Sequence, residues 1–214
     1  MTIKAIIWDL EGVILCTKEG SVPAALARVL DLPEESIKPV IGDEFDRRVN
    51  LGEFTQDEYW DYIIEKTGRP KTYKRKLENF LLQDMFIDQE ILADIHRYHK
   101  YLKTCLLSNF SSDLRALIED HWGIANAFDK ILISGEIGMI KPQPEAFRKA
   151  LDALGCQPGE AVFVDDRLEN VKGAQAVGLQ AIHYQGRSDM NKRIMSFMDQ
   201  HQNCRQQIQT SFTE

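Results

Sequence analysis

The chain has few cysteines, no long apolar run and no excess of positive charge. Its four cysteines are scattered, and no two of them form a Cys-x-x-Cys pair. This spacing excludes a thiolate metal site and a disulfide framework, and it favours reduced thiols. No stretch approaches the ~18 consecutive apolar residues of a transmembrane helix, and Asp9 interrupts the N-terminal apolar run too early for a signal peptide. We therefore expect a cytoplasmic protein with no membrane partner.

The balance of charge excludes a further class of partner. The chain has 33 acidic residues against 26 Lys and Arg, a formal net charge of −7. Bulk electrostatics would therefore not hold nucleic acid, and we expect no nucleic-acid partner. The 214 residues can form one domain or a core with a smaller insertion. Monomer and homodimer both stay open.

Five short apolar segments predict buried strands, because continuous apolar runs are typical of parallel strands that are covered on both faces. The segments are Ile3–Trp8, Thr104–Leu107, Lys130–Ser134, Ala161–Val164 and Gln180–Tyr184. Helical patterns separate them at Gln89–Leu102, Ser112–Trp122, Pro144–Leu154 and Leu168–Val177. Ser112 or Asp113 is suited to cap the second of these helices. The alternation predicts an α/β fold with a doubly wound parallel sheet.

Residues 16–85 break this alternation and have only helical patterns. The expected helices are Val22–Leu30, Glu34–Ile41, Asp43–Val49, Thr55–Thr67 and Tyr73–Leu82. Thr55 and Glu58 have the spacing of a capping box. We predict a small all-helical cap, residues 16–85, inserted after the first strand of a Rossmann-like core made of residues 1–15 and 86–202. The polar residues 203–214 are expected to form a flexible tail.

Acidic residues follow two of the predicted strands. Asp9 ends the first strand, two residues before Glu11, and Asp165 and Asp166 follow Val164. The carboxyl ends of parallel strands meet at one edge of a sheet, where open α/β folds bind ligands. Clustered carboxylates repel each other unless a divalent cation lies between them. The sequence therefore predicts a Mg²⁺ site at this edge.

Two further segments provide groups that suit a phosphate. Ser108 and Asn109 end a strand with a hydroxyl and backbone N–H groups that can hold phosphate oxygens. Lys141 lies in a proline-stiffened loop, where its charge can neutralise a phosphoryl group. A carboxylate such as Asp9 can act as a nucleophile, and Glu11 can act as a general acid and base. Each segment alone has a common structural explanation, but their order along the chain indicates one phosphate site.

In this order, the segments resemble the four signature motifs of the haloacid dehalogenase (HAD) superfamily. Asp9–Val13 resembles D-x-D-G-[TV], Ser108 the strand-terminal Ser or Thr, Lys141 the lysine of G-x-x-K-P, and Asp165–Asn170 the D-D-x-x-x-N motif. The resemblance spans the whole chain, including the helical insertion after the first motif. It implies a Mg²⁺-dependent phosphomonoesterase that acts on a small cytosolic metabolite through an aspartyl-phosphate intermediate.

The resemblance also implies roles for the metal-site residues. Asp9 would be the nucleophile, and Asp166 would ligate Mg²⁺ with the Asp9 carboxylate and the backbone carbonyl of Glu11. Asp165 and Asn170 would support that site.

For the substrate, the resemblance implies that Ser108 and Asn109 hold the phosphate while Lys141 pairs with Asp9 and the phosphoryl oxygens. The segments Asn50–Glu58 and Gly138–Phe147 are similar to those of helical-cap sugar-phosphate phosphatases of the glucose-1-phosphate type. Arg47, near the segment that would cover the pocket, is a candidate contact for a sugar or a second anionic group.

Glu11 departs from the family pattern, because phosphatases of this family usually have Asp two positions after the nucleophile. The extra methylene moves the carboxyl by about 1 Å, which costs ~10²-fold in rate if the geometry cannot adjust. The enolase-phosphatase branch is similar at this position, with D-x-E-G. The alternatives are a 2-haloacid dehalogenase, a phosphomutase, or a catalytically impaired protein that only binds phosphate.

Overall fold

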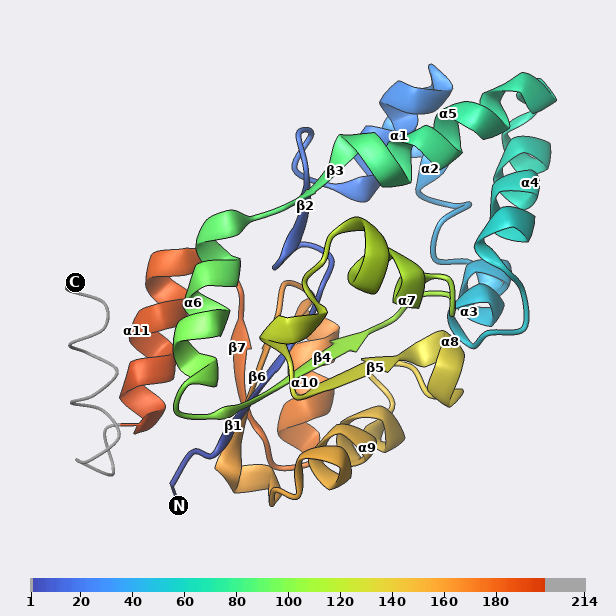
Figure 1. Cartoon of the computed structure of the whole chain (residues 1–214). Coiled ribbons are helices and arrows are strands. Elements are labelled where there is room, and N and C mark those ends of the chain that lie inside the picture. Colours follow the sequence, from blue (N-terminus) through green and yellow to red (C-terminus); the bar gives the residue numbers. More distant parts are fainter. Residues whose placement is uncertain (1, 199–214) are drawn as a thin grey trace.

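The centre of the molecule is a parallel sheet. The computed structural model describes residues 2–198 (Figure 1). Its five-stranded sheet has the order β5-β4-β1-β6-β7, and every neighbouring pair is parallel. The strands are β1 (Ala5–Trp8), β4 (Lys103–Ser108), β5 (Lys130–Ile133), β6 (Ala161–Asp165) and β7 (Gln180–His183). All five predicted strands are confirmed, with ends that differ by no more than about two residues.

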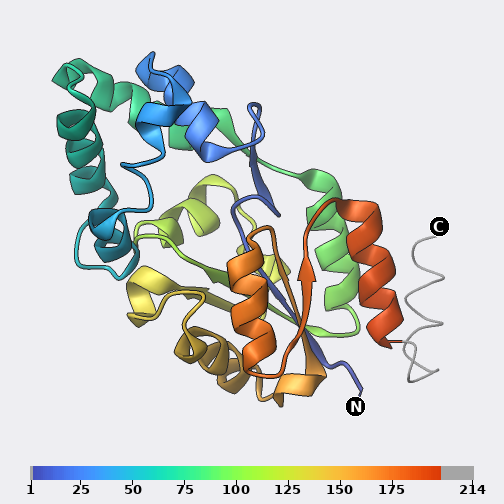
Figure 2. The same ribbon diagram turned by 180° about the vertical axis from the view of Figure 1, so that it is seen from behind.

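Helices cover both faces of this sheet, because successive strand residues point to opposite sides. Ile6 and Trp8 belong to the buried cluster that includes residues of α6 (Gln89–His99) and α11 (Arg187–Met198). Ala5 and Ile7 belong to a second cluster with α9 (Pro144–Leu154) and α10 (Leu168–Ala176). Figure 2, seen from behind, shows α10 in orange in front of the sheet. The predicted doubly wound α/β fold is therefore confirmed.

The helix after β4 differs in detail from the prediction. It begins as α7 (Leu114–Ala116), which continues into a π-helical turn at Leu117–His121. Asp113 is its N-cap residue, but the Asp113 side chain makes no hydrogen bond to this helix. Of the two predicted capping residues, Ser112 and Asp113, it is Asp113 that stands at the N-cap, but its side chain does not cap the helix because its carboxylate is engaged elsewhere. The sequence patterns also did not predict α8 (Ser134–Ile137) or α11.

Helices dominate the stretch between β1 and β4. They are α1 (Val22–Leu30), α2 (Glu34–Ile37), α3 (Glu44–Asn50), α4 (Gln56–Thr67) and α5 (Lys74–Asn79), followed by a π-helical turn at Phe80–Asp84. The predicted capping box is confirmed: the Glu58 N–H donates to Thr55 Oγ1 and the Thr55 N–H donates to Glu58 Oε2. Figure 1 shows these helices together at the upper right, beyond one end of the sheet.

Two short strands enclose this helical stretch. β2 (Leu15–Thr17) pairs antiparallel with β3 (Met85–Ile87), and Leu15 lies opposite Ile87. We call residues 18–84, which lie between the two strands, the cap segment. The chain thus enters and leaves the cap segment through one two-stranded ribbon. The division into a core of residues 1–15 and 86–202 and a cap of 16–85 stays a prediction, and residues 203–214 lie outside the described part.

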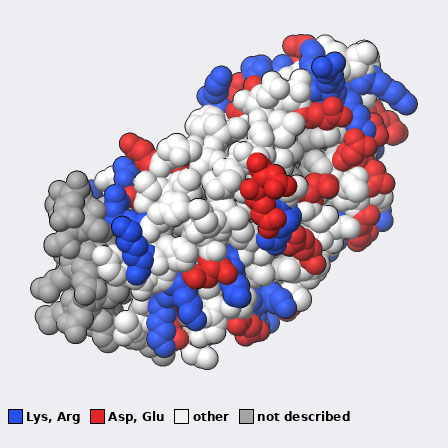
Figure 3. Space-filling model, in the orientation of Figure 1, with Lys and Arg blue, Asp and Glu red and all other residues white. Residues whose placement is uncertain are grey.

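One hydrophobic cluster joins the cap segment to the sheet. It runs from Trp8 and Ile14 to Leu26 and Ile63, all of which are almost fully buried. Each such side chain contributes roughly 1.5–3 kcal/mol of burial free energy. Within residues 2–198, no helix combines the length and the apolar character needed to cross a membrane. On the face seen in Figure 3, Lys and Arg side chains alternate with Asp and Glu over the cap segment.

Candidate active site

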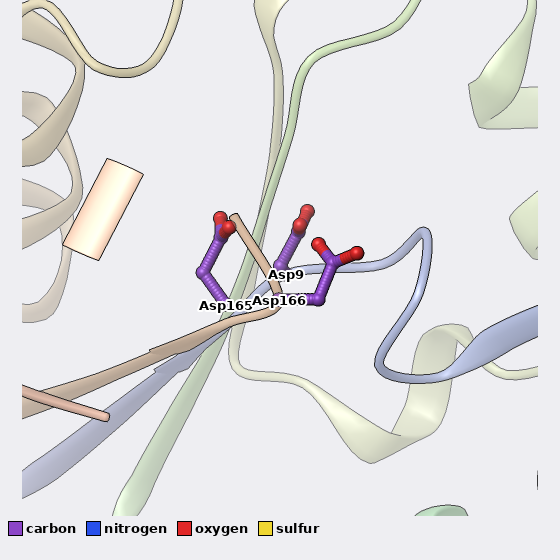
Figure 4. Close-up of side chains that lie close together, drawn as sticks. All are labelled: Asp9, Asp165 and Asp166. Atoms are coloured by element: carbon purple, nitrogen blue, oxygen red, sulfur yellow. The ribbon is translucent and has the colours of Figure 1, made fainter. Parts of the chain in front are cut away.

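The candidate site lies where the strand order reverses. β1 is hydrogen-bonded to β4 on one side and to β6 on the other, and ligands bind at such switch points in open α/β sheets. Asp9 follows β1 directly, Asp165 ends β6, and Asp166 comes next. Carboxylate oxygens of these three residues lie within 4.8 Å of one another. Figure 4 shows all three side chains rising from the strand ends toward the same region. Two distant parts of the chain thus build one acidic cluster.

Lys141 links two of these carboxylates. Its Nζ donates to Asp9 Oδ1 at 2.6 Å and to Asp165 Oδ2 at 2.8 Å, and only 1% of its side chain is exposed. Asn109, just after β4, fixes the lysine backbone: its Nδ2 donates to the Lys141 carbonyl at 2.8 Å, and the Lys141 N–H donates to its Oδ1 at 2.8 Å. The end of β4 therefore determines where the lysine stands.

The oxygens of Asp165 are occupied by donors of the protein. Besides Lys141, they accept from the Arg167 N–H at 2.8 Å and from Asn170 Nδ2 at 3.1 and 3.0 Å. Asp9 differs, because its Oδ1 also accepts from the Leu10 N–H while no described residue donates to its Oδ2. Asp165 is thus built to hold Lys141, whereas Asp9 retains a free oxygen.

Burial makes the negative charge of this cluster costly. It raises the pKa of Asp9 well above its usual range, although the Lys141 charge opposes this and Asp165 adds to it. Burial and the charge of Asp165 also raise the pKa of Asp166. Desolvation lowers the pKa of Lys141, but Asp9 and Asp165 outweigh it and raise the net value. Carboxylates outnumber the lysine at this site, and their oxygens are the donors that Mg²⁺ prefers, so the cluster fits a divalent cation.

Glu11 lies between this cluster and the cap segment. Crowding by protein atoms, followed by the charge of Asp166, raises the pKa of Glu11 to about 7, and Arg167 opposes this rise. Solvent still reaches the residue. Asp46 of α3 adds to the rise. Burial, Asp46 and, to a smaller extent, Glu11 raise the pKa of Tyr59 of α4. A carboxyl that titrates near neutral pH can both donate and accept a proton.

Gly12 allows this arrangement. Its φ of +80° lies in the left-handed region, which side chains rarely adopt. A Cβ at this position would lie 2.3 Å from Asp166 Oδ2. Only glycine therefore lets the loop after β1 pass so close to the Asp166 carboxylate.

Ser108 and Arg47 are the remaining residues that the sequence predicts for the site. Ser108 is the buried last residue of β4, opposite Ile133. The side chain of Arg47 on α3 is 45% exposed and pairs with Glu44 at 3.2 Å. The phosphate-binding roles of Ser108 and Arg47 stay predictions. The sequence patterns did not single out Asp46 or Arg167, although Arg167 directly follows the acidic pair.

The profile of the haloacid dehalogenase-like hydrolases matches residues 3–178, and the chain belongs to this family.

Among individual proteins, the phosphoserine phosphatase of Thermus thermophilus is 33% identical over 137 residues, which cover 61% of this chain and 54% of that protein. The bifunctional epoxide hydrolase 2 of Rattus norvegicus is 26% identical over 202 residues, 85% of this chain and 36% of that protein. The chain thus spans about half the length of these relatives or less. A HAD family enzyme from Bacteroides thetaiotaomicron, solved with magnesium and inorganic phosphate, has a TM-score of 0.67 at 22% identity and covers 84% of this chain and 93% of its own. This likeness shows the fold.

Proposed function

We propose that the protein is a Mg²⁺-dependent phosphomonoesterase that acts on a small phosphorylated metabolite through an aspartyl-phosphate intermediate. The observation that carries this proposal is Lys141 bridging Asp9 and Asp165 beside Asp166 at the switch point of the sheet. A relative named as a phosphatase and a structural neighbour solved with magnesium and phosphate support it.

We assign the cation to the oxygens that the protein leaves available. These are the carboxylates of Asp9 and Asp166, with the backbone carbonyl of Glu11 as a third donor. Asp165 supports the site without ligating the cation, because its oxygens accept hydrogen bonds from Lys141, Arg167 and Asn170. When bound, Mg²⁺ would offset the repulsion between this acidic cluster and an incoming phosphate.

The side chains of the site then divide the reaction between them. The Asp9 carboxylate attacks phosphorus through one of its two oxygens, while Lys141, which donates to Oδ1, neutralises charge on the phosphoryl oxygens. The bond between phosphorus and the leaving oxygen breaks, and Glu11 gives its proton to that oxygen. Glu11 next takes a proton from water, which attacks the aspartyl-phosphate and releases inorganic phosphate. Ser108 and Asn109 bind phosphoryl oxygens throughout.

The proposal is tested by release of inorganic phosphate from p-nitrophenyl phosphate. We expect turnover with Mg²⁺, loss of turnover with EDTA, and a fall of roughly 10⁴-fold for Asp9→Asn, because removal of a nucleophile leaves only binding and electrostatic contributions. Asp152→Asn, an exposed position on α9, is the matched control and should retain full activity. Robust turnover by the Asp9→Asn protein would exclude the nucleophile that we assign.

Glu11 is tested by two substitutions of different length. We expect Glu11→Gln to lower kcat by roughly 10²-fold, the usual share of a general acid and base. Glu11→Asp keeps the carboxyl but retracts it, and its activity should lie between those of the native and Gln proteins. Equal activity of all three proteins would instead indicate that Glu11 takes no part in proton transfer.

For the substrate, we propose a sugar phosphate or a similar small monoester with hydroxyl groups. Asp46 of the cap segment raises the pKa of Glu11, and Glu11 in turn raises the pKa of Tyr59; both cap residues can hydrogen-bond a hydroxyl. A screen of phosphorylated metabolites, including glucose 1-phosphate and phosphoserine, would rank the candidates. An isomerised sugar phosphate among the products would identify a mutase.

A further inference from the structure

The cap segment meets the core at a second place, away from the β2–β3 ribbon. Gly52, with φ +80°, lies so close to Gly135 of α8 that an added Cβ would stand 2.1 Å from the Gly135 carbonyl oxygen. An added Cβ on Gly135 would in turn stand 2.6 Å from the Ser112 backbone nitrogen. Three backbone segments therefore touch at this point without intervening side chains. In Figure 1, this contact lies beside α3 and α8, and the ribbon lies on another side of the cap segment.

A polar contact accompanies this backbone approach. Oδ2 of Asp113 accepts from the Gln56 N–H at 2.8 Å, across 57 residues of sequence. Ser111 Oγ donates to Gln56 Oε1 at 3.3 Å. Ser111 and Gln56 are 1% and 9% exposed. We call Gly52, Gln56, Ser111, Asp113 and Gly135 the latch.

The Asp113 carboxylate completes the N-terminus of a cap helix. The first N–H groups of a helix lack partners within it. In α4, the capping box satisfies Thr55 and Glu58, and the N–H of the first residue, Gln56, finds its acceptor on the core. A carboxylate at this end also interacts favourably with the helix dipole. The side chain that fails to cap its own helix thus caps a helix of the cap segment.

The loop that bears Asp113 is itself fixed to the active site. At its start, Asn109 forms two hydrogen bonds with the backbone of Lys141. Next to it, the Phe110 N–H donates to Ser134 Oγ at 2.9 Å, and the Phe110 carbonyl accepts from the Gly135 N–H at 3.0 Å. The position of Asp113 is therefore tied to that of Lys141.

We propose that Asp113 is a positioning residue, which fastens the cap segment closed over the active site in a fixed relation to Lys141. The chain holds the cap segment at the β2–β3 ribbon, and the latch holds it on the other side. Opening then requires the bond between Asp113 and Gln56 to break while the ribbon stays intact. This inference adds a closure step to the proposed phosphatase, but its principal test needs no catalysis.

Hydrogen–deuterium exchange of the whole protein measures closure directly. We expect Asp113→Ala to speed exchange of amides in residues 52–60 by about 10-fold, the usual effect of losing a charge-assisted hydrogen bond. Asp113→Asn keeps an acceptor oxygen without the charge and should give a smaller increase, about 3-fold. Exchange in α1 and α9 should not change. Asp120→Asn, an exposed position in the same helical region, serves as the control.

Two exchange results would overturn the proposal. Unchanged exchange in residues 52–60 would show that Asp113 does not hold the cap segment. An equal increase throughout α1, α4 and α5 would show that the cap segment unfolds rather than opens.

Steady-state kinetics distinguish a positioning role of Asp113 from a purely structural one. If Asp113→Ala lowers the closed fraction, the apparent affinity falls by that fraction, while saturating substrate restores closure. We therefore expect KM for p-nitrophenyl phosphate to rise by about 10-fold and kcat to change by less than about 3-fold. A loss in kcat at constant KM would contradict the proposal. A protein without phosphatase activity would refute the proposed function alone, since the exchange result still decides on the latch.

Discussion

The two sides of the active site are held in place by different interactions. On the core side, Lys141, Asp9 and Asp165 form buried ion pairs, with 1%, 7% and 0% of their side chains exposed. On the cap side, the ion pair of Arg48 and Glu53 has 44% and 46% exposed. Buried charges lose several kcal/mol when one partner is removed, whereas exposed pairs are worth about 0–1 kcal/mol. We therefore expect the loss of one charged partner to cost more free energy at the Lys141 cluster than at the pair of Arg48 and Glu53.

The largest effect that would test this comparison is expected for Lys141→Met. The substitution leaves Asp9 and Asp165 buried without their cation, and we expect a loss of about 3–5 kcal/mol in unfolding free energy at pH 7. Urea unfolding measures it. Lys149→Met, at an exposed position of α9, is the control and should lie within about 0.5 kcal/mol of the native protein. An equally small loss for Lys141→Met would remove the distinction between the two sides.

A second buried network lies in the core, away from the chemistry. Asp94 is fully buried and accepts from Arg187 Nε at 2.6 Å and Asn191 Nδ2 at 2.7 Å, which join α6 to α11. Burial raises the pKa of Asp94, but the hydrogen bonds of Arg187 and Asn191 outweigh it, so the net pKa lies below 3.8. A depressed carboxyl pKa stabilises the fold above the unfolded value, near 3.9, and this stabilisation is lost as the pH falls through the folded value.

We therefore expect Asp94→Asn to cost about 3 kcal/mol at pH 7. The difference from the native protein should shrink as the pH falls below about 3.9. Unfolding measured at several pH values checks this, and phosphatase activity should be unchanged while the protein is folded. A difference that grows toward low pH would contradict the depressed pKa of Asp94.

Three glycines share one backbone conformation but differ in what surrounds them, so their alanine variants separate backbone strain from steric clashes. Gly12, Gly20 and Gly52 have φ of +80°, +79° and +80°, but nothing lies within 4 Å of an added Cβ at Gly20. Gly20→Ala should therefore report backbone strain alone, about 1 kcal/mol. Gly12→Ala and Gly52→Ala add a steric clash, and we expect about 2 kcal/mol or more from each.

Their kinetic effects should differ. Gly12→Ala displaces Asp166 and should lower kcat, whereas Gly52→Ala pushes the cap segment from Gly135 and should raise KM. Steady-state kinetics of the three variants check this, with Gly20→Ala expected to match the native enzyme. The same kinetic change in both clashing variants would show that the two contacts are not separate.

The smallest effect is expected on the exposed side of the cap segment. Arg48 Nε donates to Glu53 at 2.6 Å, and the guanidinium lies 4.7 Å from the centre of the Phe54 ring. A double-mutant cycle with Arg48→Ala and Glu53→Ala should give a coupling free energy below about 1 kcal/mol. A coupling of several kcal/mol would place a strong charge pair on the cap side as well.

Local signals explain which elements could be predicted from the sequence. The sheet strands are continuous apolar runs, and α9 was predicted to the residue because Pro144 begins it and Gly155, with φ +64°, ends it. β2 and β3 have three residues each, and they form only because Leu15 meets Ile87 far along the chain. No local pattern reports such a pairing.

At the site, too, local patterns do not report contacts between distant segments. The order of the motifs along the chain predicts that Asp9, Lys141 and Asp166 meet at one place. The bond from Asp113 to Gln56 spans 57 residues, so local propensity placed Asp113 on its own helix instead. The neighbours of Glu11 also depend on how α3 and α4 pack beyond the end of the sheet, which periodicity does not specify.

We propose above all that Asp9 attacks phosphorus at a site whose carboxylates, Asp9 and Asp166, would hold Mg²⁺. Mass spectrometry of the acid-quenched reaction with p-nitrophenyl phosphate tests it most directly. We expect one phosphoryl group on the peptide that contains Asp9 when Mg²⁺ is present, and none when EDTA is added. Continued hydrolysis with the label absent from Asp9, or present on another residue, would contradict the account.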